Sequence, residues 1–307
     1  MAFEAMTQRR AGTSFHLFFT MNPQEYYRRI QAVVRPEQLH GRKVMVIGLG
    51  SGGSRLAAEL GRLGLDLCLV DRPNERLEEH NVIRHLLDYR SLGELKTQAV
   101  AEWIRHRNPW TRVQTLDLDV VAQSEQLAAA LEERHPDLIA VCTDNLESQF
   151  AVNILAVQRG IPEVGAAVYD GGVGGEVYCV RPAQACLGCI AAHLQLQRPE
   201  PRTDLNIDYN QLDRDELRSV GALNLDIEQI AILQTRMALQ LLLGTATDLT
   251  GIPPDVNLLV FANRTGNPPL NRPLHAEFFR IPANPDCLIC GAPMRTGNAG
   301  SGSVAES

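Results

Sequence analysis

The sequence predicts an α/β fold in which a mostly parallel sheet is extended by antiparallel strands. Short apolar segments alternate with segments of helical length between residues 42 and 160, and parallel strands need such crossover connections. Beyond residue 160, two apolar segments flank a glycine-rich turn, which is typical of an antiparallel pair. A chain of 307 residues, 45% of them hydrophobic, is long enough to bury a full core.

The elements of the parallel part follow one another without long interruptions. We expect strands at 42–48, 65–71, 111–120 and 137–144, and helices at 50–64, 93–109, 124–136 and 145–160. Residues 161–182 then predict two strands around a glycine-rich turn, and 227–244 a strongly apolar helix, buried in the core or in a subunit interface. Further strands are expected at 257–264 and 275–281.

The ends of the chain and one internal segment have a different composition. We expect residues 1–22 to be a flexible leader and residues 23–291 to form one domain, which opens with an amphipathic helix over 23–34. Residues 198–218 are polar and rich in Asp and Pro, which predicts a flexible crossing segment, and residues 292–307 predict a disordered tail.

Charge and hydropathy exclude several classes of partner. The formal net charge of −7 argues against nucleic acid or an anionic membrane as the main partner. No run of eighteen apolar residues is present, and the first residues lack the apolar core and cleavage site of a signal peptide. We therefore expect a cytoplasmic protein.

A glycine-rich loop joins the first predicted strand to the following helix. Gly48, Gly50 and Gly53 have the GxGxxG spacing of Rossmann-like folds, in which the backbone and a helix N-terminus approach phosphate. Asp71 ends the next strand, where a carboxylate can accept ribose hydroxyls. The alternative is that the glycines serve only strand–helix packing. The loop indicates a nucleotide without distinguishing NAD, FAD and ATP.

Three charged residues after the loop favour adenylyl transfer over hydride transfer. When a carboxylate attacks the α-phosphorus of ATP, cations must offset the charge that builds on the phosphates, and a carboxylate must hold Mg²⁺. Arg84, Lys96 and Asp144 supply these groups in that order. Each also has a simpler interpretation, the cations as surface residues and Asp144 as a helix N-cap.

Four of the seven cysteines form two CxxC pairs, CLGC at 186–189 and CLIC at 287–290. Cys186, Cys189, Cys287 and Cys290 can supply the four thiolates of a structural zinc site, which would clip the tail back onto the domain. Redox or disulfide use is the alternative. The three remaining cysteines lie in apolar segments and are expected to be small buried residues: Cys68, Cys142 and Cys179.

From about residue 24 to residue 291 the chain resembles the ThiF/MoeB/ubiquitin-activating-enzyme adenylation family. The matching strings are YYRRI, VIGLGSGG, LVD, HNVIRH, LKT, CTDN and the two cysteine pairs. The resemblance implies ATP, Mg²⁺ and Zn²⁺ as cofactors and assigns roles to individual positions. The implied nucleotide residues are Gly48, Gly50, Gly52 and Gly53 in the loop, Asp71 on ribose, Asn81, Arg84 and Lys96 on phosphates, and Asp144 on Mg²⁺.

The same resemblance implies that Arg28 reaches into the active site of a second subunit, so that a homodimer is expected. Arg29 is the alternative, since a shift of one residue would exchange them. The chain also departs from the family pattern. Ser51 replaces a glycine of the loop, and His85 stands where the family commonly has Gln.

The predicted function is ATP-dependent adenylation of the C-terminal glycine of a small β-grasp carrier, either ubiquitin-like or a sulfur carrier, ending in Gly-Gly. No cysteine lies between Cys189 and Cys287, so we expect an acyl-adenylate without a thioester on this chain, and a separate thiol- or sulfur-transfer protein downstream. The alternatives are a non-catalytic carrier-binding relative and a nicotinamide- or flavin-dependent oxidoreductase.

Overall fold

The computed structural model describes residues 22–195, 221–244, 249–266 and 269–291. The predictions of a leader at 1–22, a crossing segment at 198–218 and a tail at 292–307 lie outside these residues, apart from Asn22. The chain divides into two compact units, residues 1–35 and 36–307.

Within its described residues, 22–35, the first unit contains one short helix, α1 (Pro23–Tyr27). Asn22 caps it, because its side chain accepts a hydrogen bond from the backbone N–H of Gln24 at 2.9 Å. The predicted continuation of this helix to residue 34 is wrong. Residues 28–33 form turns, in which Ile30 and Val33 bond to carbonyls three positions back.

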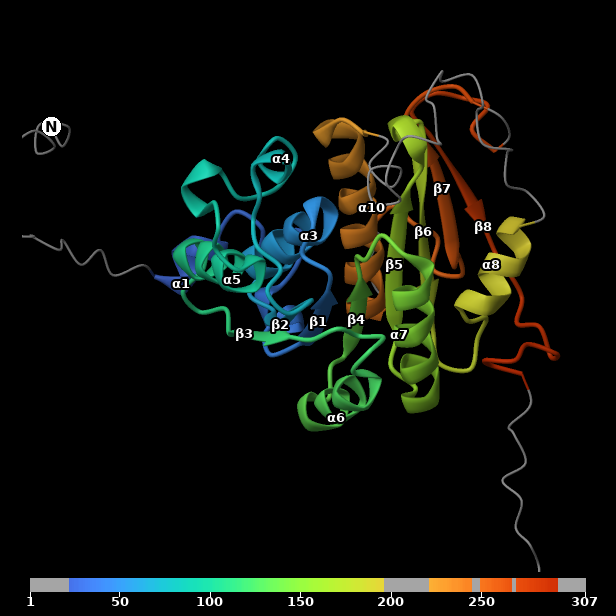
Figure 1. The fold of residues 1–307 in the computed structure, drawn as a ribbon, viewed down its shortest axis with the longest axis horizontal. Coiled ribbons are helices and arrows are strands. Elements are labelled where there is room, and N and C mark those ends of the chain that lie inside the picture. The colour runs from blue at the N-terminus through green and yellow to red at the C-terminus, as the bar shows by residue number, and fades with distance from the viewer. Residues whose placement is uncertain (1–21, 196–220, 245–248, 267–268, 292–307) are drawn as a thin grey trace, which may run out of the picture. The chain divides into compact units, whose positions relative to one another are not determined.

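The second unit is built on an eight-stranded sheet with the order β3-β2-β1-β4-β5-β6-β7-β8 (Figure 1). Pairing is parallel from β3 to β5 and antiparallel from β5 to β8, which confirms the predicted α/β fold class. The strands are β1 (Lys43–Ile47), β2 (Asp66–Asp71), β3 (Val113–Asp117), β4 (Leu138–Val141), β5 (Glu163–Val168), β6 (Gly174–Val180), β7 (Leu258–Ala262) and β8 (His275–Phe279).

Long helices cover both faces of this sheet (Figure 1). On one face α3 packs between α5 and α10, and on the other α7 packs between α6 and α8. Two residues of β6 show the two faces, since successive side chains alternate: Gly175 lies against Ile230 of α10, whereas Tyr178 belongs to the core beneath α8. These helices are α3 (Ser51–Arg62), α5 (Lys96–Arg107), α6 (Ser124–Arg134), α7 (Leu146–Arg159), α8 (Leu187–Gln195) and α10 (Asn224–Leu243).

The apolar helix expected at 227–244 is α10, and it packs into the core of the second unit. It packs against α3 and against β4, β5 and β6, with buried side chains along its length. The short elements are α2 (Pro36–Leu39), α4 (Glu79–Val82), η1 (Tyr89–Ser91) and η2 (Asp170–Gly172). None of the helices described here has the length and apolar content needed to cross a membrane.

The chain reverses its direction across the sheet between β1 and β4, which are neighbours. At such a switch point the connections after the two strands leave toward opposite faces and open a crevice where α/β proteins bind ligands. The glycine-rich loop follows β1, and Asp144 follows β4. The fold therefore brings two of the sequence-predicted segments to the same edge.

Candidate nucleotide site and cysteine cluster

The glycines of the loop after β1 differ in the contacts that a Cβ would make at each position. Gly48 has φ +89°, and a Cβ on it would lie 2.9 Å from the carbonyl carbon and oxygen of Cys142. A Cβ on Gly53 would overlap the carbonyl oxygen of Gly48. These two glycines are required by packing. A Cβ on Gly50 would meet no atom within 4 Å, so packing does not explain this glycine.

Asp71 is fixed to this loop at the end of β2. Its Oδ2 accepts a hydrogen bond from the backbone N–H of Leu49 at 2.9 Å, and its Oδ1 accepts one from the N–H of Arg72 at 2.9 Å. Burial raises the pKa of Asp71, while these two bonds and the charge of Lys96 act in the opposite direction. The carboxylate predicted to hold ribose and the loop predicted to hold phosphate thus form one unit.

Lys96 is the first residue of α5, and its side chain is only 8% exposed. Its Nζ lies 2.7 Å from Oε1 of Glu75, which also pairs with Arg72 at 3.2 Å. Burial raises the pKa of Glu75, but the hydrogen bond and charge of Lys96 outweigh it and hold that pKa below its usual value. The interpretation of Lys96 as a surface residue is wrong.

Glu75 is a residue of this site that the sequence did not reveal. An isolated antiparallel bridge pairs Arg76 with Leu95 and so places Glu75 beside Lys96, whose backbone N–H donates to the Glu75 carbonyl at 3.0 Å. A lysine at a helix N-terminus faces the positive end of the helix dipole, and burial adds to that cost. From the sequence one could have inferred that Lys96 needs a carboxylate nearby, but not that Glu75 supplies it.

The segment around α4 holds Asn81, Arg84 and His85. Asn81 accepts a hydrogen bond from the N–H of Glu78 at 3.0 Å through Oδ1, which completes a capping box and leaves its NH₂ group for other partners. Arg84 is half-buried, and no group in the described ranges binds its guanidinium. His85 is buried, and its Nε2 lies 2.7 Å from the carbonyl oxygen of Leu49. The arginine thus precedes a residue bonded to the glycine loop.

Asp144 is exposed just beyond β4. The suggestion that it caps the next helix is wrong, because Asn145 is the N-cap of α7 and accepts a hydrogen bond from the N–H of Ser148 at 2.8 Å. Asp144 therefore has no capping role. It follows Cys142 and Thr143, whose backbone lies against Gly48.

Arg28 lies in the first compact unit, where its Nη1 is 3.3 Å from Oε2 of exposed Glu25. Its predicted role across a subunit interface therefore stays a prediction.

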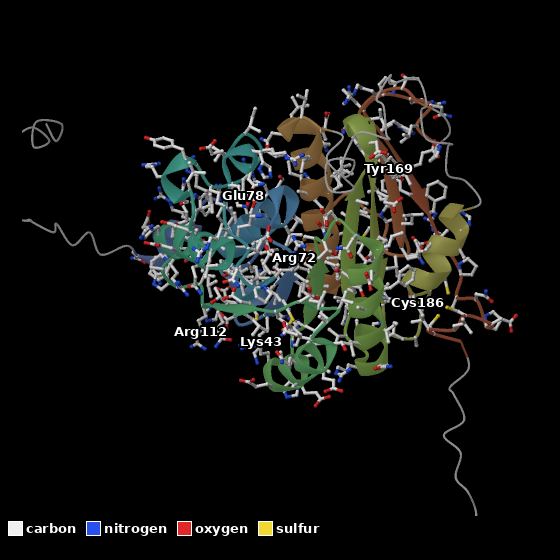
Figure 2. All side chains as sticks on the ribbon, viewed as in Figure 1. Lys43, Arg72, Glu78, Arg112, Tyr169 and Cys186 are labelled. Carbon is white, nitrogen blue, oxygen red and sulfur yellow. The ribbon has the colours of Figure 1, made fainter. Side chains whose placement is uncertain are left out.

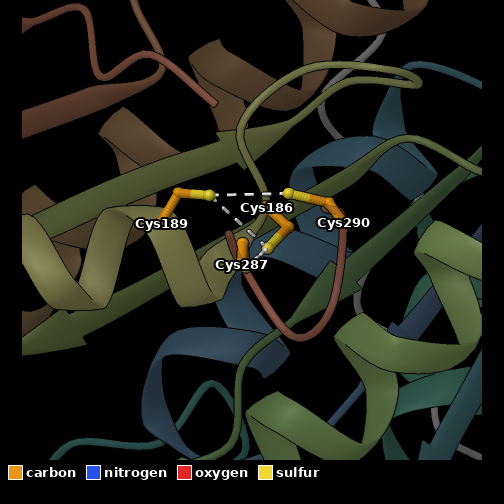
Figure 3. Close-up of side chains that lie close together, drawn as sticks. All are labelled: Cys186, Cys189, Cys287 and Cys290. Atoms are coloured by element: carbon orange, nitrogen blue, oxygen red, sulfur yellow. Dashed lines mark hydrogen bonds between the residues drawn. The ribbon is translucent and has the colours of Figure 1, made fainter. Parts of the chain in front are cut away.

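The four cysteines of the two CxxC pairs meet in one cluster (Figure 3). Their sulfur atoms all lie within 4.8 Å of one another, with 3.5 Å between Cys186 and Cys287 and between Cys189 and Cys290. Zn–S bonds of about 2.3 Å imply sulfur separations of roughly 3.8 Å in a tetrahedron, so the donor set fits zinc. All four are free thiols rather than disulfides. Figure 2 shows Cys186 well apart from Arg72, the neighbour of Asp71.

Of the other three cysteines, Cys68 and Cys179 are buried, as expected. Cys142 is only partly buried, and its Sγ lies 3.6 Å from Oε1 of Gln234 on α10. Burial raises the pKa of all three thiols, that of Cys142 to about 12 and that of Cys179 to about 11. Such thiols are poor nucleophiles.

A switch-point glycine loop, an anchored carboxylate and a buried lysine define a nucleotide-binding α/β protein, here with a separate cluster of four cysteines. The chain belongs to the ThiF family, whose profile matches residues 26–287.

Among its curated relatives is ubiquitin-like modifier-activating enzyme 5 of Drosophila ananassae, 27% identical over 171 residues, which are 52% of this chain and 43% of the relative. The enzyme of the same name from Aedes aegypti is 25% identical over 234 residues, 73% of this chain and 56% of the relative. The alignments thus cover about half the length of these relatives.

Solved structures of E. coli MccB have the same fold. The complex with ATP is 16% identical, with a TM-score of 0.62 over 88% of this chain and 75% of MccB. The complex with N-formylated MccA is also 16% identical, with a TM-score of 0.63 over 88% of this chain and 76% of MccB.

Proposed function

We propose that this protein uses ATP to adenylate the C-terminal carboxylate of a small protein. One observation supports this proposal most directly. At the switch point of the sheet, the glycine loop is hydrogen-bonded to Asp71, and the charge of buried Lys96 acts on the same carboxylate. The names of the relatives support the substrate class, since they are ubiquitin-like modifier-activating enzymes. MccB, which shares the fold, has been solved with ATP and with the peptide MccA.

The reaction joins a carboxylate oxygen of the carrier to the α-phosphorus of ATP and breaks the bond from that phosphorus to the bridging oxygen. Acyl-adenylate and pyrophosphate leave, and no proton is transferred. The groups of this chain need only position the phosphates and offset their charge. In the proposal Asp71 holds ribose, Gly48, Gly50, Gly52 and Gly53 line the phosphates, Asn81, Arg84 and Lys96 bind them, and Asp144 holds Mg²⁺.

Two features of the residues fit these roles. Arg84 and Asp144 have no protein partner assigned to their charged groups in the described ranges, so they can bind a ligand without breaking an ion pair. Lys96 is already paired with Glu75, and the pair holds the ammonium group in place before the nucleotide arrives. Preorganised charge of this kind lowers the cost of reorganisation during reaction.

The wider proposal covers partners and location. The substrate is a β-grasp carrier ending in Gly-Gly, the active unit is a homodimer in which Arg28 acts across the interface, and the protein is cytoplasmic. We assign no thioester to this chain, because the thiols of Cys68, Cys142 and Cys179 have raised pKa values and the other four are grouped in the cluster. A separate protein would then supply the thiol or sulfur.

For the cysteine cluster we propose one structural zinc ion, held by Cys186, Cys189, Cys287 and Cys290. Four thiolates close the coordination shell, so this ion would have no position for substrate. Zinc here would join α8 to the end of the domain.

Isotope exchange between pyrophosphate and ATP tests the proposed reaction. Exchange that depends on a Gly-Gly-ended carrier is expected, and Lys96→Ala and Asp144→Ala should strongly reduce it. The absence of exchange with every carrier tried, in protein that still binds ATP, would favour a non-catalytic carrier-binding protein. Mixing Arg28→Ala with Lys96→Ala subunits should restore part of the activity, because one of the two sites in a mixed dimer then has both residues.

A further inference from the structure

His85 makes a hydrogen bond with each of its ring nitrogens. The backbone N–H of Leu87 donates to Nδ1 at 3.1 Å, so Nδ1 must carry no proton. Nε2 then carries the only ring proton and donates it to the carbonyl oxygen of Leu49 at 2.7 Å. His85 is 4% exposed as a whole residue, and both polar atoms of its ring are hydrogen-bonded only in this neutral tautomer.

Leu49 lies between the first two glycines of the loop and is held from both sides. Its N–H donates to Oδ2 of Asp71 at 2.9 Å, and its carbonyl accepts from His85. These two atoms belong to the two peptide groups that flank the Leu49 Cα, and neither group can rotate without breaking its hydrogen bond. The orientation of the glycine loop therefore depends on His85 as well as on Asp71.

Two more bonds attach the segment around His85 to α3. The Leu86 N–H donates to Oγ of Ser54 at 3.4 Å, and Nη2 of Arg55 donates to the carbonyl oxygen of His85 at 3.3 Å. Arg84 immediately precedes this attached segment. Its guanidinium is thus carried on a backbone whose position relative to the loop is fixed.

The charged groups that act on the His85 ring are Lys96 from α5 and Arg55 from α3. Burial and these two cations lower the pKa of His85 to about 4. A protonated ring would turn its Nδ1–H toward the Leu87 N–H and lose that bond. The attachment is therefore complete at neutral pH and is lost as the pH falls toward 4.

We propose that His85 is a positioning residue for the nucleotide, which in its neutral tautomer fixes the Leu49 carbonyl and thereby sets Arg84 against the glycine loop. This inference rests on the proposed function, because it assumes that the loop and Arg84 bind the same phosphates. His85 itself touches no substrate in this account.

The first test uses the unaltered protein without nucleotide. Nitrogen-15 NMR of the histidine rings should show His85 as the Nε2–H tautomer, neutral at pH 6. A ring protonated at pH 6, or one carrying its proton on Nδ1, contradicts the proposal regardless of whether the protein binds ATP.

The second test compares His85→Phe with His85→Gln by calorimetric titration with ATP. Phe fills the same space without hydrogen bonds, whereas the Gln amide can donate to Leu49 and accept from Leu87. We expect His85→Phe to weaken ATP binding roughly tenfold or more, and His85→Gln to recover most of the loss. His106→Gln, an exposed histidine near the end of α5, is the matched control and should bind ATP like the unaltered protein.

The ATP affinities of the unaltered protein and of His85→Gln should also depend differently on pH. Between pH 6 and pH 4 the unaltered protein should lose ATP affinity relative to His85→Gln, which has no group to protonate there. At neutral pH, an ATP affinity of His85→Phe equal to that of the unaltered protein, or a Gln variant as weak as the Phe variant, overturns the inference. If the unaltered protein binds no ATP, the proposed function fails instead. The NMR measurement of the ring tautomer then still tests whether His85 makes the two hydrogen bonds.

Discussion

Lys96 and Glu75 form a partly buried ion pair, with 2.7 Å between Nζ and Oε1, that joins the start of α5 to the loop after β2. Because Arg72 pairs with the same carboxylate, Glu75 keeps a partner when the lysine is removed. This arrangement makes Lys96 an informative position to change, since its loss does not leave a carboxylate without a cation.

We expect Lys96→Ala to reduce ATP–pyrophosphate exchange by about 100-fold or more, the range found when one preorganised charge-stabilising group is removed. Lys43→Ala is the matched control, because Lys43 is the only other lysine of the chain. It lies at the start of β1, whereas the glycine loop follows the end of that strand, and its Nζ donates to the carbonyl oxygen of Arg134. Exchange at the unaltered rate in Lys96→Ala would remove this residue from the site.

Asp144 and Asn145 are neighbours with separable contributions. Asp144→Asn should abolish the Mg²⁺-dependent exchange while leaving the melting temperature unchanged, because Asp144 is exposed and caps no helix. Asn145→Ala removes the N-cap of α7 and should lower the free energy of unfolding by about 1 kcal/mol. Thermal melts and exchange assays on both variants check the two effects, and a large stability loss in Asp144→Asn would contradict the assignment.

The loop glycines should divide into two groups when changed to alanine. Gly48→Ala forces a Cβ against the Cys142 carbonyl at a positive φ, and should lower the free energy of unfolding by about 2–4 kcal/mol. Gly50→Ala meets no protein atom and should leave the unfolding midpoint in urea almost unchanged while weakening ATP binding. An unaltered ATP affinity in Gly50→Ala argues against close approach of phosphate at that residue.

Glu163 on β5 is fully buried, and it accepts hydrogen bonds from Nδ2 of Asn153 at 2.8 Å and from the hydroxyl of Tyr178 at 3.1 Å. Burial raises its pKa from 4.5 to about 7. The folded state therefore binds this proton more tightly than the unfolded state, and stability falls as the pH rises from 4.5 to 7.

Compared with Glu163→Gln, the unaltered protein should lose about 3 kcal/mol of unfolding free energy over that interval. Urea denaturation at pH 5 and pH 8 measures the difference. A constant difference between the two proteins across this range indicates that Glu163 keeps an ordinary pKa.

Metal analysis should find one zinc ion per chain, and Cys189→Ser should remove it and lower the melting temperature. Cys68→Ala is the control, because Cys68 is buried but lies outside the cluster, so stability can fall while the zinc content does not. Zinc retained in full by Cys189→Ser excludes the four-thiolate site.

Hydrophobic periodicity was sufficient for most of the sheet because most strands are apolar runs between turn residues, as LDLCLVD and NLLVFANR illustrate. It failed after Tyr27, where residues of helical spacing form turns instead. The loop glycines and paired cysteines could be identified because their spacing is itself the geometric requirement. Glu75 and the role of His85 could not, since both depend on contacts across 21 and 36 positions that no local pattern encodes.

The cysteine cluster has a consequence for how the protein is made. Cys186 and Cys287 are 101 positions apart, and α10, β7 and β8 lie between them. At ribosomal elongation rates of about 5–20 residues per second, the first pair emerges roughly 5–20 seconds before the second. Nascent chains arrested before residue 287, but long enough for Cys186 and Cys189 to have left the ribosome, should therefore leave these two thiols open to alkylation. During synthesis, Cys186 and Cys189 must therefore remain reduced until Cys287 and Cys290 have been translated.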